Sequence, residues 1–500
     1  MKLRILFLLA LLPSSLLSAQ VTLPRILSDH MVVQRDMPVH LWGMAAPRQQ
    51  VQAAFRGQTA STTANRLGQW SLYLKPGAAG GPFSMTIEGL AAPGATANTI
   101  QLSDILVGDV WLASGQSNME FELHRAATAT QDLPNSAIPN LRLLMVDKKS
   151  ATYAQTDIET PGWQDSNPET ARNFSAVAWY FAREIREREH VPVGIIDSTW
   201  GGTIVESWTR LTAIGEDASL APLFISRGEM TDHEATGQLE EKDEQRQIQE
   251  AKAAGKPVPQ FPWHPPLDTW APGLLWNGMI APLTPFTIRG VIWYQGESNS
   301  ALARAPLYSR IFRDMIADWR SQWNLGNFPF LFVQIASFKS TPLEDWAELR
   351  QQQLMTLNLA NTAMAVTIDI GNPDNVHPTD KVDVGHRLAL AARVLSYGES
   401  VIDSGPLFRQ ATPEGSSMRA WFNDADGLTA KGGSVTGFEV AGADRKFVPA
   451  TARIEGTTIV ASSPQVARPL YLRYGWANSP DCNLFNAAGL PASPFTSVPY

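Results

Sequence analysis

Two patterns of hydrophobic and polar positions follow one another along this 500-residue chain. Between residues 21 and 105, short apolar runs alternate with polar positions at period two, which is typical of half-buried strands. Turns rich in glycine and proline, such as residues 76–82, separate these runs. Because this part contains no convincing helical period, we predict an N-terminal β-sandwich over residues 20–104.

The pattern changes at Ile105, where a nearly continuous apolar run begins, as expected of a parallel strand buried on both faces. From there, strands alternate with amphipathic helices, which predicts an α/β fold with a parallel sheet and helices on both faces over residues 105–404. The predicted strands are residues 105–113, 193–196, 291–294, 330–335 and 363–370, and the predicted helices are 173–190, 307–323, 343–357 and 381–395.

Two segments depart from this alternation. Residues 215–260 contain a strongly charged stretch that ends at Gly255 and Pro257, and we interpret it as an exposed helical insertion with a solvated face. After about residue 405, short strands and turns return, which predicts a C-terminal β region over residues 405–500. Neither β region repeats the other.

The first 19 residues have the build of a secretory signal peptide. Lys2 and Arg4 form a basic start, residues 5–12 are apolar, and small residues precede a cut after Ala19. No cysteine follows that could take a lipid, and no later segment reaches the roughly 18 apolar residues that span a bilayer. We therefore expect a secreted or periplasmic protein without a membrane anchor.

Composition narrows the class of protein further. A net charge of −8 without a basic run gives no reason to expect a nucleic-acid partner. The single cysteine, Cys482, excludes a disulfide scaffold and a cysteine-based zinc site, so that packing must supply the stability. No pattern fixes the oligomeric state.

Candidate chemistry lies in loops that directly follow predicted strands. Gly115–Met119 (GQSNM) follows the strand ending near Ala113, and the carboxyl edge of a parallel sheet is where such folds bind ligands. Ser117 could be exposed in this turn as a nucleophile, or it could simply cap a helix. Residues 198–203 contain Gly201 and Gly202, whose small size would let backbone N–H groups approach a reacting oxygen, although Gly-Gly is also ordinary in turns.

A serine nucleophile needs a base, and the base needs an acceptor on its other ring nitrogen. Asp374 lies three residues before His377 in a loop after a predicted strand, and it can fold back to that nitrogen. The motif at residues 293–299 (WYQGESN) offers two more groups at the same edge. Gln295 could donate into an oxyanion hole, and Glu297 could orient a partner or serve as an alternative acid.

These blocks resemble the SGNH-type esterases, and specifically the sialate O-acetylesterase family. The likeness includes GQSNM at 115–119, WYQGESN at 293–299, and the terminal Asp374 and His377 pair. It continues outside the blocks and covers nearly the whole mature chain, with the charged 215–260 stretch as the departure. These further segments are residues 27–35, 276–282 and 483–495.

The resemblance implies a serine esterase that removes acetyl groups from carbohydrates without a metal or organic cofactor. Ser117 would attack the acetyl carbonyl, His377 would move the proton, and Asp374 would hold the tautomer of His377, with Glu297 as the competing acid. The oxyanion would be met by the Ser117 backbone N–H, a backbone N–H of Gly201 or Gly202, and the Gln295 side chain. Gln116 and Asn118 would support the nucleophile block.

One departure concerns the third block, where the wider superfamily usually offers asparagine and this chain has Gln295, whose longer side chain changes the oxyanion geometry. Among substrates, sialic acids compete with acetylated plant polysaccharides such as xylan or pectin. A non-catalytic carbohydrate-binding protein would have no need for these polar loops. A peptidase or lipase is disfavoured because the chain lacks a Gly-x-Ser-x-Gly elbow at Ser117.

Overall fold

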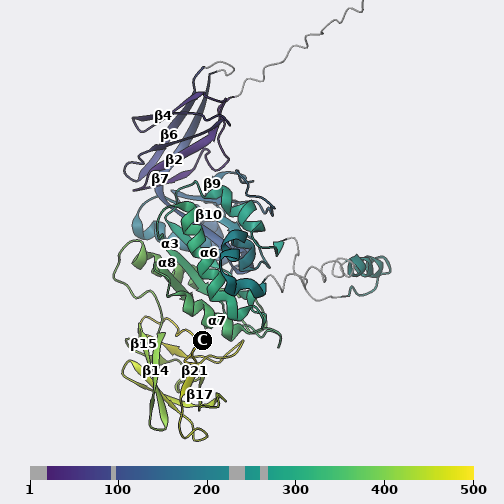
Figure 1. Cartoon of the computed structure of the whole chain (residues 1–500), viewed down its shortest axis with the longest axis vertical. Coiled ribbons are helices and arrows are strands. Elements are labelled where there is room, and N and C mark those ends of the chain that lie inside the picture. Colours follow the sequence, from purple (N-terminus) through teal and green to yellow (C-terminus); the bar gives the residue numbers. More distant parts are fainter. Residues whose placement is uncertain (1–19, 92–96, 224–241, 260–268) are drawn as a thin grey trace, which may run out of the picture.

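The computed structural model describes residues 20–91, 97–223, 242–259 and 269–500. Figure 1 shows three parts in order along the long axis: N-terminal strands, a central α/β part, and C-terminal strands. The predicted signal peptide, residues 1–19, lies outside the described residues, as do residues 224–241 and 260 of the charged insertion. Within that insertion, residues 242–253 are helical and largely exposed.

The N-terminal strands form two antiparallel sheets that share one apolar core. β2 (Val39–Met44) pairs with β5 (Gln69–Leu74), and β3 (Gln50–Phe55) pairs with β4 (Gln58–Thr63) and β6 (Gly80–Gly89). Alternate residues are buried along β5 and β3, as the period-two pattern predicts. A short strand, β1 (Val32–Gln34), pairs in parallel with residues 106–108 of the long strand described next.

A single 18-residue strand, β7 (Asn98–Gly115), joins this region to the central part. Its first half pairs antiparallel with β6, and its second half pairs parallel with two strands of the central sheet. The boundary that we predict at residue 105 therefore falls inside one continuous strand.

The central sheet has the order β13-β12-β11-β7-β10-β8-β9 and is parallel except for β9 at its edge. Its strands β7, β10, β11 and β12 are buried along their central stretches, which explains their continuous apolar character. The bounds are β8 Leu141–Met145, β9 Trp163–Asp165, β10 Val193–Thr199, β11 Gly290–Tyr294, β12 Phe330–Gln334 and β13 Thr362–Val366.

Helices cover both faces of this sheet. On one face, α3 (Ala176–Glu189) packs closely against α8 (Val382–Leu395), because Gly385 offers no side chain where a Cβ would lie 2.6 Å from the Cβ of Tyr180. On the other face, rings of α6 (Tyr308–Trp323) pack against Trp293 of β11, and α7 follows as Trp346–Thr356. The shorter helices are α1 Ser117–Glu120, α2 Ala129–Asp132, α4 Leu211–Glu216 and the π-helical turn Trp276–Ile280.

Two details differ from the sequence-based expectation. Helix α3 begins at Ala176 rather than Asn173, because the Ser175 hydroxyl caps it by accepting a hydrogen bond from the Ala178 N–H at 3.1 Å. The pattern also did not predict β8 and β9, which extend the sheet beyond β10. None of the helices in the described ranges is long and apolar enough to cross a bilayer.

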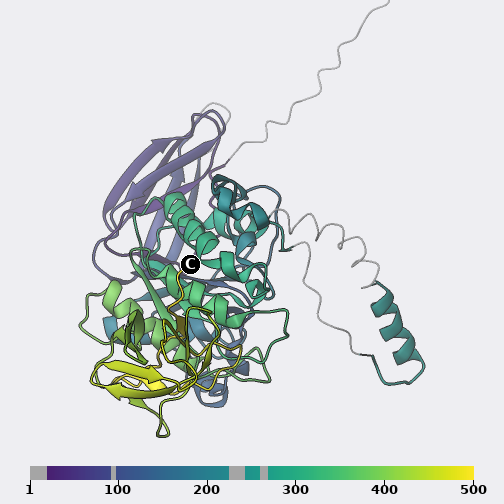
Figure 2. The same cartoon turned by 60° about the horizontal axis from the view of Figure 1, so that its bottom comes forward.

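The C-terminal strands form two four-stranded sheets and a small pair around a separate apolar core. Figure 1 and Figure 2 both show them at the end of the molecule opposite the N-terminal strands. The bounds are β14 Leu407–Glu414, β15 Ser417–Asn423, β16 Thr429–Ala430, β17 Phe438–Ala441, β18 Val448–Pro449, β19 Thr451–Glu455, β20 Thr458–Ser462, β21 Tyr471–Tyr474, β22 Leu484–Phe485 and β23 Phe495–Thr496.

A buried arginine on α7 ties this region to the central part. The Arg350 guanidinium donates to the carbonyl oxygens of Ile335 and Ala336 at the end of β12, at 2.9 and 2.8 Å. It also donates to the carbonyls of Ala477 and Asn478 in the C-terminal region, at 2.9 and 2.8 Å. Burial lowers the pKa of Arg350 to about 10, so the side chain stays charged at neutral pH.

We expect the Arg350→Met variant to lower the free energy of unfolding by about 3 kcal/mol or more, because each buried acceptor left without its donor costs about 1–3 kcal/mol. Urea unfolding followed by tryptophan fluorescence measures this loss. Arg453→Met, which removes an exposed ion pair with Glu455, is the control and should stay within about 0.5 kcal/mol of the parent. If both variants lost the same free energy of unfolding, Arg350 would not be the residue that ties the C-terminal region to the central part.

Candidate active site

Four loops meet at the carboxyl edge of the central sheet. Gly115 at the end of β7 is aligned with Thr199 in β10 and with Tyr294 in β11, so the loops that follow these three strands begin at one level. The fourth loop follows β13 and leads into α8, and it contains His377. The strand order thus places all the predicted polar motifs at the same edge, as parallel sheets of this kind do with their ligand sites.

Glycine is required where β7 turns into α1. Gly115 has a φ of +134°, and a Cβ at this position would lie 2.2 Å from the carbonyl oxygen of Tyr294. The next residue, Gln116, is buried, and its side-chain oxygen accepts hydrogen bonds from the N–H groups of Gly296 and Ser298, both at 3.2 Å. Gln116 therefore fixes the third block against the nucleophile block.

Ser117 and His377 are in direct contact. The Nε2 atom of His377 lies 2.8 Å from the Ser117 hydroxyl, at hydrogen-bond distance, although 260 positions separate the residues in sequence. Burial lowers the pKa of His377, and the positive charges of Lys381 and Arg125 lower it further. The imidazole is therefore neutral at pH 7 and can accept the serine proton.

Asn118 is the centre of a buried polar network beneath this pair. Its amide donates to Glu297 Oε1 at 2.6 Å and to the carbonyl of Val376 at 3.0 Å, and its oxygen accepts from Lys381 Nζ at 2.7 Å. The network joins the neighbours of Ser117 and His377 to a buried cation and a buried carboxyl group. Sequence reasoning did not identify Lys381, which lies four residues after His377 and is fully buried.

Burial shifts the pKa values of Glu297 and Lys381, the two ionisable members of this network, in opposite directions. Burial raises the pKa of Glu297, while the hydrogen bond from Asn118 and the charge of Lys381 oppose that rise. Burial lowers the pKa of Lys381 to about 7, and the charge of Glu297 opposes that fall. The Oε2 atom of Glu297 is buried and has no hydrogen-bond partner among the described groups.

Asp374 lies apart from His377 in this structure. Its side chain is 84% exposed, and its carboxylate faces Lys339 Nζ at 3.6 Å. In the described part of the chain no hydrogen bond joins Asp374 to His377, which differs from the arrangement that the Asp-x-x-His spacing predicts. The physical reason is that the loop turns on Asn372 and Asn375, whose side-chain oxygens accept the N–H groups of Asp374 and His377, both at 2.9 Å.

Gln295 also departs from its expected role. Its amide nitrogen donates to the carbonyl of Thr203 at 3.1 Å and to Asn299 Oδ1 at 2.7 Å, and its amide oxygen accepts from the Tyr308 hydroxyl at 2.8 Å. Both amide hydrogens are used inside the protein, so they cannot also meet an oxyanion. The Gln295 side chain therefore links the loop after β11 to the loop after β10 through Thr203.

The glycine loop after β10 lies directly against the nucleophile. A Cβ on Gly201 would lie 3.2 Å from the Cβ of Ser117, and the Gly201 N–H donates to the carboxylate of Glu120. Gly202 has a φ of +74°, and its carbonyl accepts from the Trp270 indole at 2.6 Å. The N–H of Gly202, in contrast, has no acceptor within the described ranges.

One group of side chains outside the site has the composition of a metal site. His30, Asp104 and Asp165 bring their ligand atoms within 4.8 Å of one another. The Arg142 guanidinium donates to both carboxylates, at 2.7 Å to Asp104, so a protein cation already occupies the position between them. We therefore interpret this group as an ion-pair network.

Comparisons with known proteins give the family of this chain. Residues 107–229 and 266–394 match the family described as carbohydrate esterase, sialic acid-specific acetylesterase. The chain is 31% identical to the sialate O-acetylesterase of Mus musculus over 419 residues, covering 76% of this chain and 74% of that protein. It is 28% identical to the sialate O-acetylesterase of Homo sapiens over 522 residues, covering 94% and 91% of the two chains.

Among solved structures, a carbohydrate acetylesterase from Xanthomonas citri is 38% identical and has a TM-score of 0.82. The likeness covers 96% of this chain and all of the other. Since the family match spans just over half of the chain and includes the Ser117 and His377 loops, the chain belongs to the sialic acid-specific acetylesterase family of carbohydrate esterases.

Proposed function

We propose that this protein removes O-acetyl groups from sialic acids, with Ser117 as nucleophile and His377 as base. The observation that carries the proposal is the 2.8 Å contact between the Ser117 hydroxyl and His377 Nε2 at the edge where three parallel strands end together. The curated relatives bear the name sialate O-acetylesterase, and family membership makes the chain a carboxylic ester hydrolase. The parallel sheet and the order of the motifs support an SGNH-type catalytic fold over residues 105–404.

The reaction follows from the geometry of this pair. As Ser117 Oγ forms a bond to the acetyl carbonyl carbon, its proton passes to Nε2 of the neutral His377. The resulting imidazolium then gives that proton to the sugar oxygen as the ester bond breaks. A water molecule, deprotonated in turn by His377, then forms a bond to the acetyl carbon. His377 returns that proton to Ser117 Oγ as the acetyl–serine bond breaks and acetate leaves.

The negative oxygen of the intermediate needs donors that the protein does not already use. The N–H groups of Ser117 and Gly202 have no acceptor in the described part of the chain, and the glycine loop lies against Ser117. We assign these two groups to the oxyanion hole. Gly201 supports them through Glu120, and Gln295 supports them through Thr203.

Asp374 is our proposal for the carboxylate that orients His377. Its exposed ion pair with Lys339 is of a kind that contributes only about 0–1 kcal/mol, so this pair does not hold the side chain away from His377. Contact with Nδ1 of His377 also requires the turn on Asn372 and Asn375 to shift. Glu297, the competing carboxyl group, is already held by Asn118 at 2.6 Å. Through Asn118 it acts as a positioning residue for the Ser117 and His377 loops.

Arg125 gives the neighbourhood of the site an exposed cation, beside the opposite charge of Glu120. Arg125 is exposed, and it and Lys381 are close enough to His377 to lower its pKa. A sialic acid carries a carboxylate that an exposed guanidinium can bind, whereas xylan offers no such group. We place the protein outside the cytoplasm, secreted or periplasmic, on the pattern of its first 19 residues.

The mature protein should release acetate fastest from O-acetylated sialic acids when it is compared on acetylated xylan, pectin and chitin fragments at equal ester concentration. Enzymatic acetate assay of the four reactions measures this. The control is Ser117→Ala, which should reduce every rate by about 10⁴-fold or more while near-UV circular dichroism stays unchanged. Undiminished turnover in that variant would overturn the mechanism, and preference for xylan would overturn the substrate.

The Asp374→Asn variant should lower kcat by at least about 100-fold with little change in KM, because orienting the base matters mainly in the transition state. Steady-state kinetics on p-nitrophenyl acetate measure the two constants. Lys339→Gln is the matched control, since it breaks the same ion pair without touching the carboxylate, and it should keep its parent's kcat. A mild Asp374→Asn together with a severe Glu297→Gln would transfer the orienting role to Glu297.

The acid limb of the kcat/KM profile should lie below pH 6.5, because burial lowers the pKa of His377 and the base is lost only as the pH falls through that lowered value. The Arg125→Gln variant removes an exposed positive charge that lowers this pKa, so its acid limb should move to higher pH. Initial rates from pH 4 to 8 measure both. An unmoved limb would show that Arg125 does not act on His377.

A further inference from the structure

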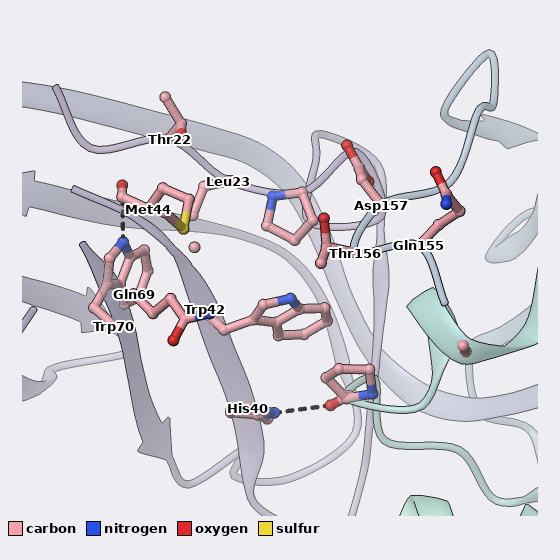
Figure 3. Close-up of a pocket in the computed structure, with 14 residues that line it drawn as sticks. Thr22, Leu23, His40, Trp42, Met44, Gln69, Trp70, Gln155, Thr156 and Asp157 are labelled. Carbon is pink, nitrogen blue, oxygen red and sulfur yellow. Dashed lines mark hydrogen bonds between the residues drawn. The ribbon is translucent and has the colours of Figure 1, made fainter. Parts of the chain in front are cut away.

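A cavity lies at the junction of the N-terminal and central regions, and none of its described lining residues belongs to the loops around Ser117. Its volume is about 530 Å³, and it is formed where β2 and β5 of the N-terminal region meet the central part. On the central side it is lined by Ala281 and Pro285, which precede β11, whereas the proposed site lies after β11 ends. The cavity is therefore toward the amino edge of the sheet, whereas the candidate active site follows its carboxyl edge. Figure 3 shows the residues that line the cavity.

One wall of this cavity is a fixed aromatic surface. The Trp42 indole stacks on His40 with ring centroids 5.0 Å apart, and His40 stacks on Tyr73 at 4.5 Å. Nδ1 of His40 donates to the carbonyl of Pro285 at 2.9 Å, and its Nε2 lies 2.7 Å from the Ser71 hydroxyl. Burial lowers the pKa of His40, so this ring is neutral. Because it bonds to Pro285 and stacks on Trp42, it fixes the indole at the junction of the two regions.

The opposite wall is polar and partly unused. Figure 3 shows the Trp42 indole pointing from β2 toward the segment that carries Gln155, Thr156 and Asp157. Asp157 uses Oδ1 to accept the N–H groups of Arg25 and Ile158, both at 2.9 Å, which leaves Oδ2 available. Within the described residues, the Trp42 indole N–H and the Thr156 hydroxyl also have no hydrogen-bond partner.

We propose that this cavity is a second carbohydrate-binding site, which takes a neutral pyranose unit of a glycan. An indole face offers a flat apolar surface to the C–H groups of a pyranose ring, and hydroxyl groups match a mixture of donors and acceptors at the rim. The volume lies within the range of small-ligand pockets, which is about 300–1,000 Å³.

The charge of the lining selects between sugars. Asp157 is the charged side chain among the described lining residues, and His40 is neutral. The nearby Arg25 guanidinium is outside the lining and donates to the carbonyl of Ile158 at 2.8 Å. The described lining itself offers a carboxylate and no cation, so it suits a neutral sugar better than a sialic acid, on which the proposed reaction acts at the other edge. The site goes beyond the hydrolytic function: it anchors the neutral part of a substrate glycan, not the ester.

Isothermal titration of the mature Ser117→Ala protein with unesterified lactose, cellotetraose and xylotetraose tests the site, because none of these sugars can be hydrolysed. We expect about millimolar binding of at least one neutral sugar that depends on Trp42. N-acetylneuraminic acid should bind only at the Ser117 edge, so its binding should not depend on Trp42. Trp42→Ala in the same background should weaken that binding at least about tenfold, and Trp42→Phe, which keeps an aromatic ring, should weaken it less.

Two controls separate this result from a folding defect or a failure of catalysis. Trp421→Ala removes a partly buried indole from β15, outside the cavity, and should leave sugar binding unchanged. Trp42→Ala with Ser117 restored should hydrolyse p-nitrophenyl acetate within twofold of the parent rate. Absence of neutral-sugar binding, neutral-sugar binding that survives both Trp42 variants, or binding of N-acetylneuraminic acid that Trp42→Ala weakens would each overturn the proposal, whatever the esterase assays show.

Discussion

The parallel register of β7 with its two neighbours decides where this protein can do chemistry. Because Gly115 is level with Thr199 and Tyr294, three loops leave the sheet from one line, and their short polar motifs converge without long excursions. The register also leaves no space for a side chain at Gly115, where a Cβ would meet the Tyr294 carbonyl at 2.2 Å. The turn that presents Ser117 is therefore a product of strand pairing, and the other groups of the site are arranged around it.

Buried side-chain amides, rather than apolar side chains, join the loops around the Ser117 turn. Gln116, Asn118 and Gln295 each bridge two loops, and each has its hydrogen-bonding groups largely used. Such networks define one arrangement when they are satisfied and are costly when they are not. Lys381 and Glu297 bond to opposite ends of the Asn118 amide, and burial shifts the pKa of each toward its neutral form, beside a histidine that must stay unprotonated.

The sequence pattern predicted the order of elements better than the direction of side chains. Continuous apolar runs predicted β10, β11 and β12, because strands that are buried on both faces are apolar at nearly every position. The start of α3 was not predicted, because it depends on a cap by Ser175 and hydrophobic periodicity does not show caps. Motif positions predicted that Ser117 and His377 share an edge. The orientations of Gln295 and Asp374 depend on partners such as Tyr308 and Lys339, which are distant in sequence or outside the motif. A lysine at a helix start normally suggests exposure, so Lys381 escaped notice.

Strand β7 has a consequence for how this architecture can change over time. The N-terminal strands and the central sheet share one backbone segment, with no linker at which one could be exchanged for another. A recombination event near residue 105 would cut through paired strands and separate Gly115 from the residues that set its register. Exchange of the N-terminal region would therefore require a replacement whose own strand continues β7 in the same register.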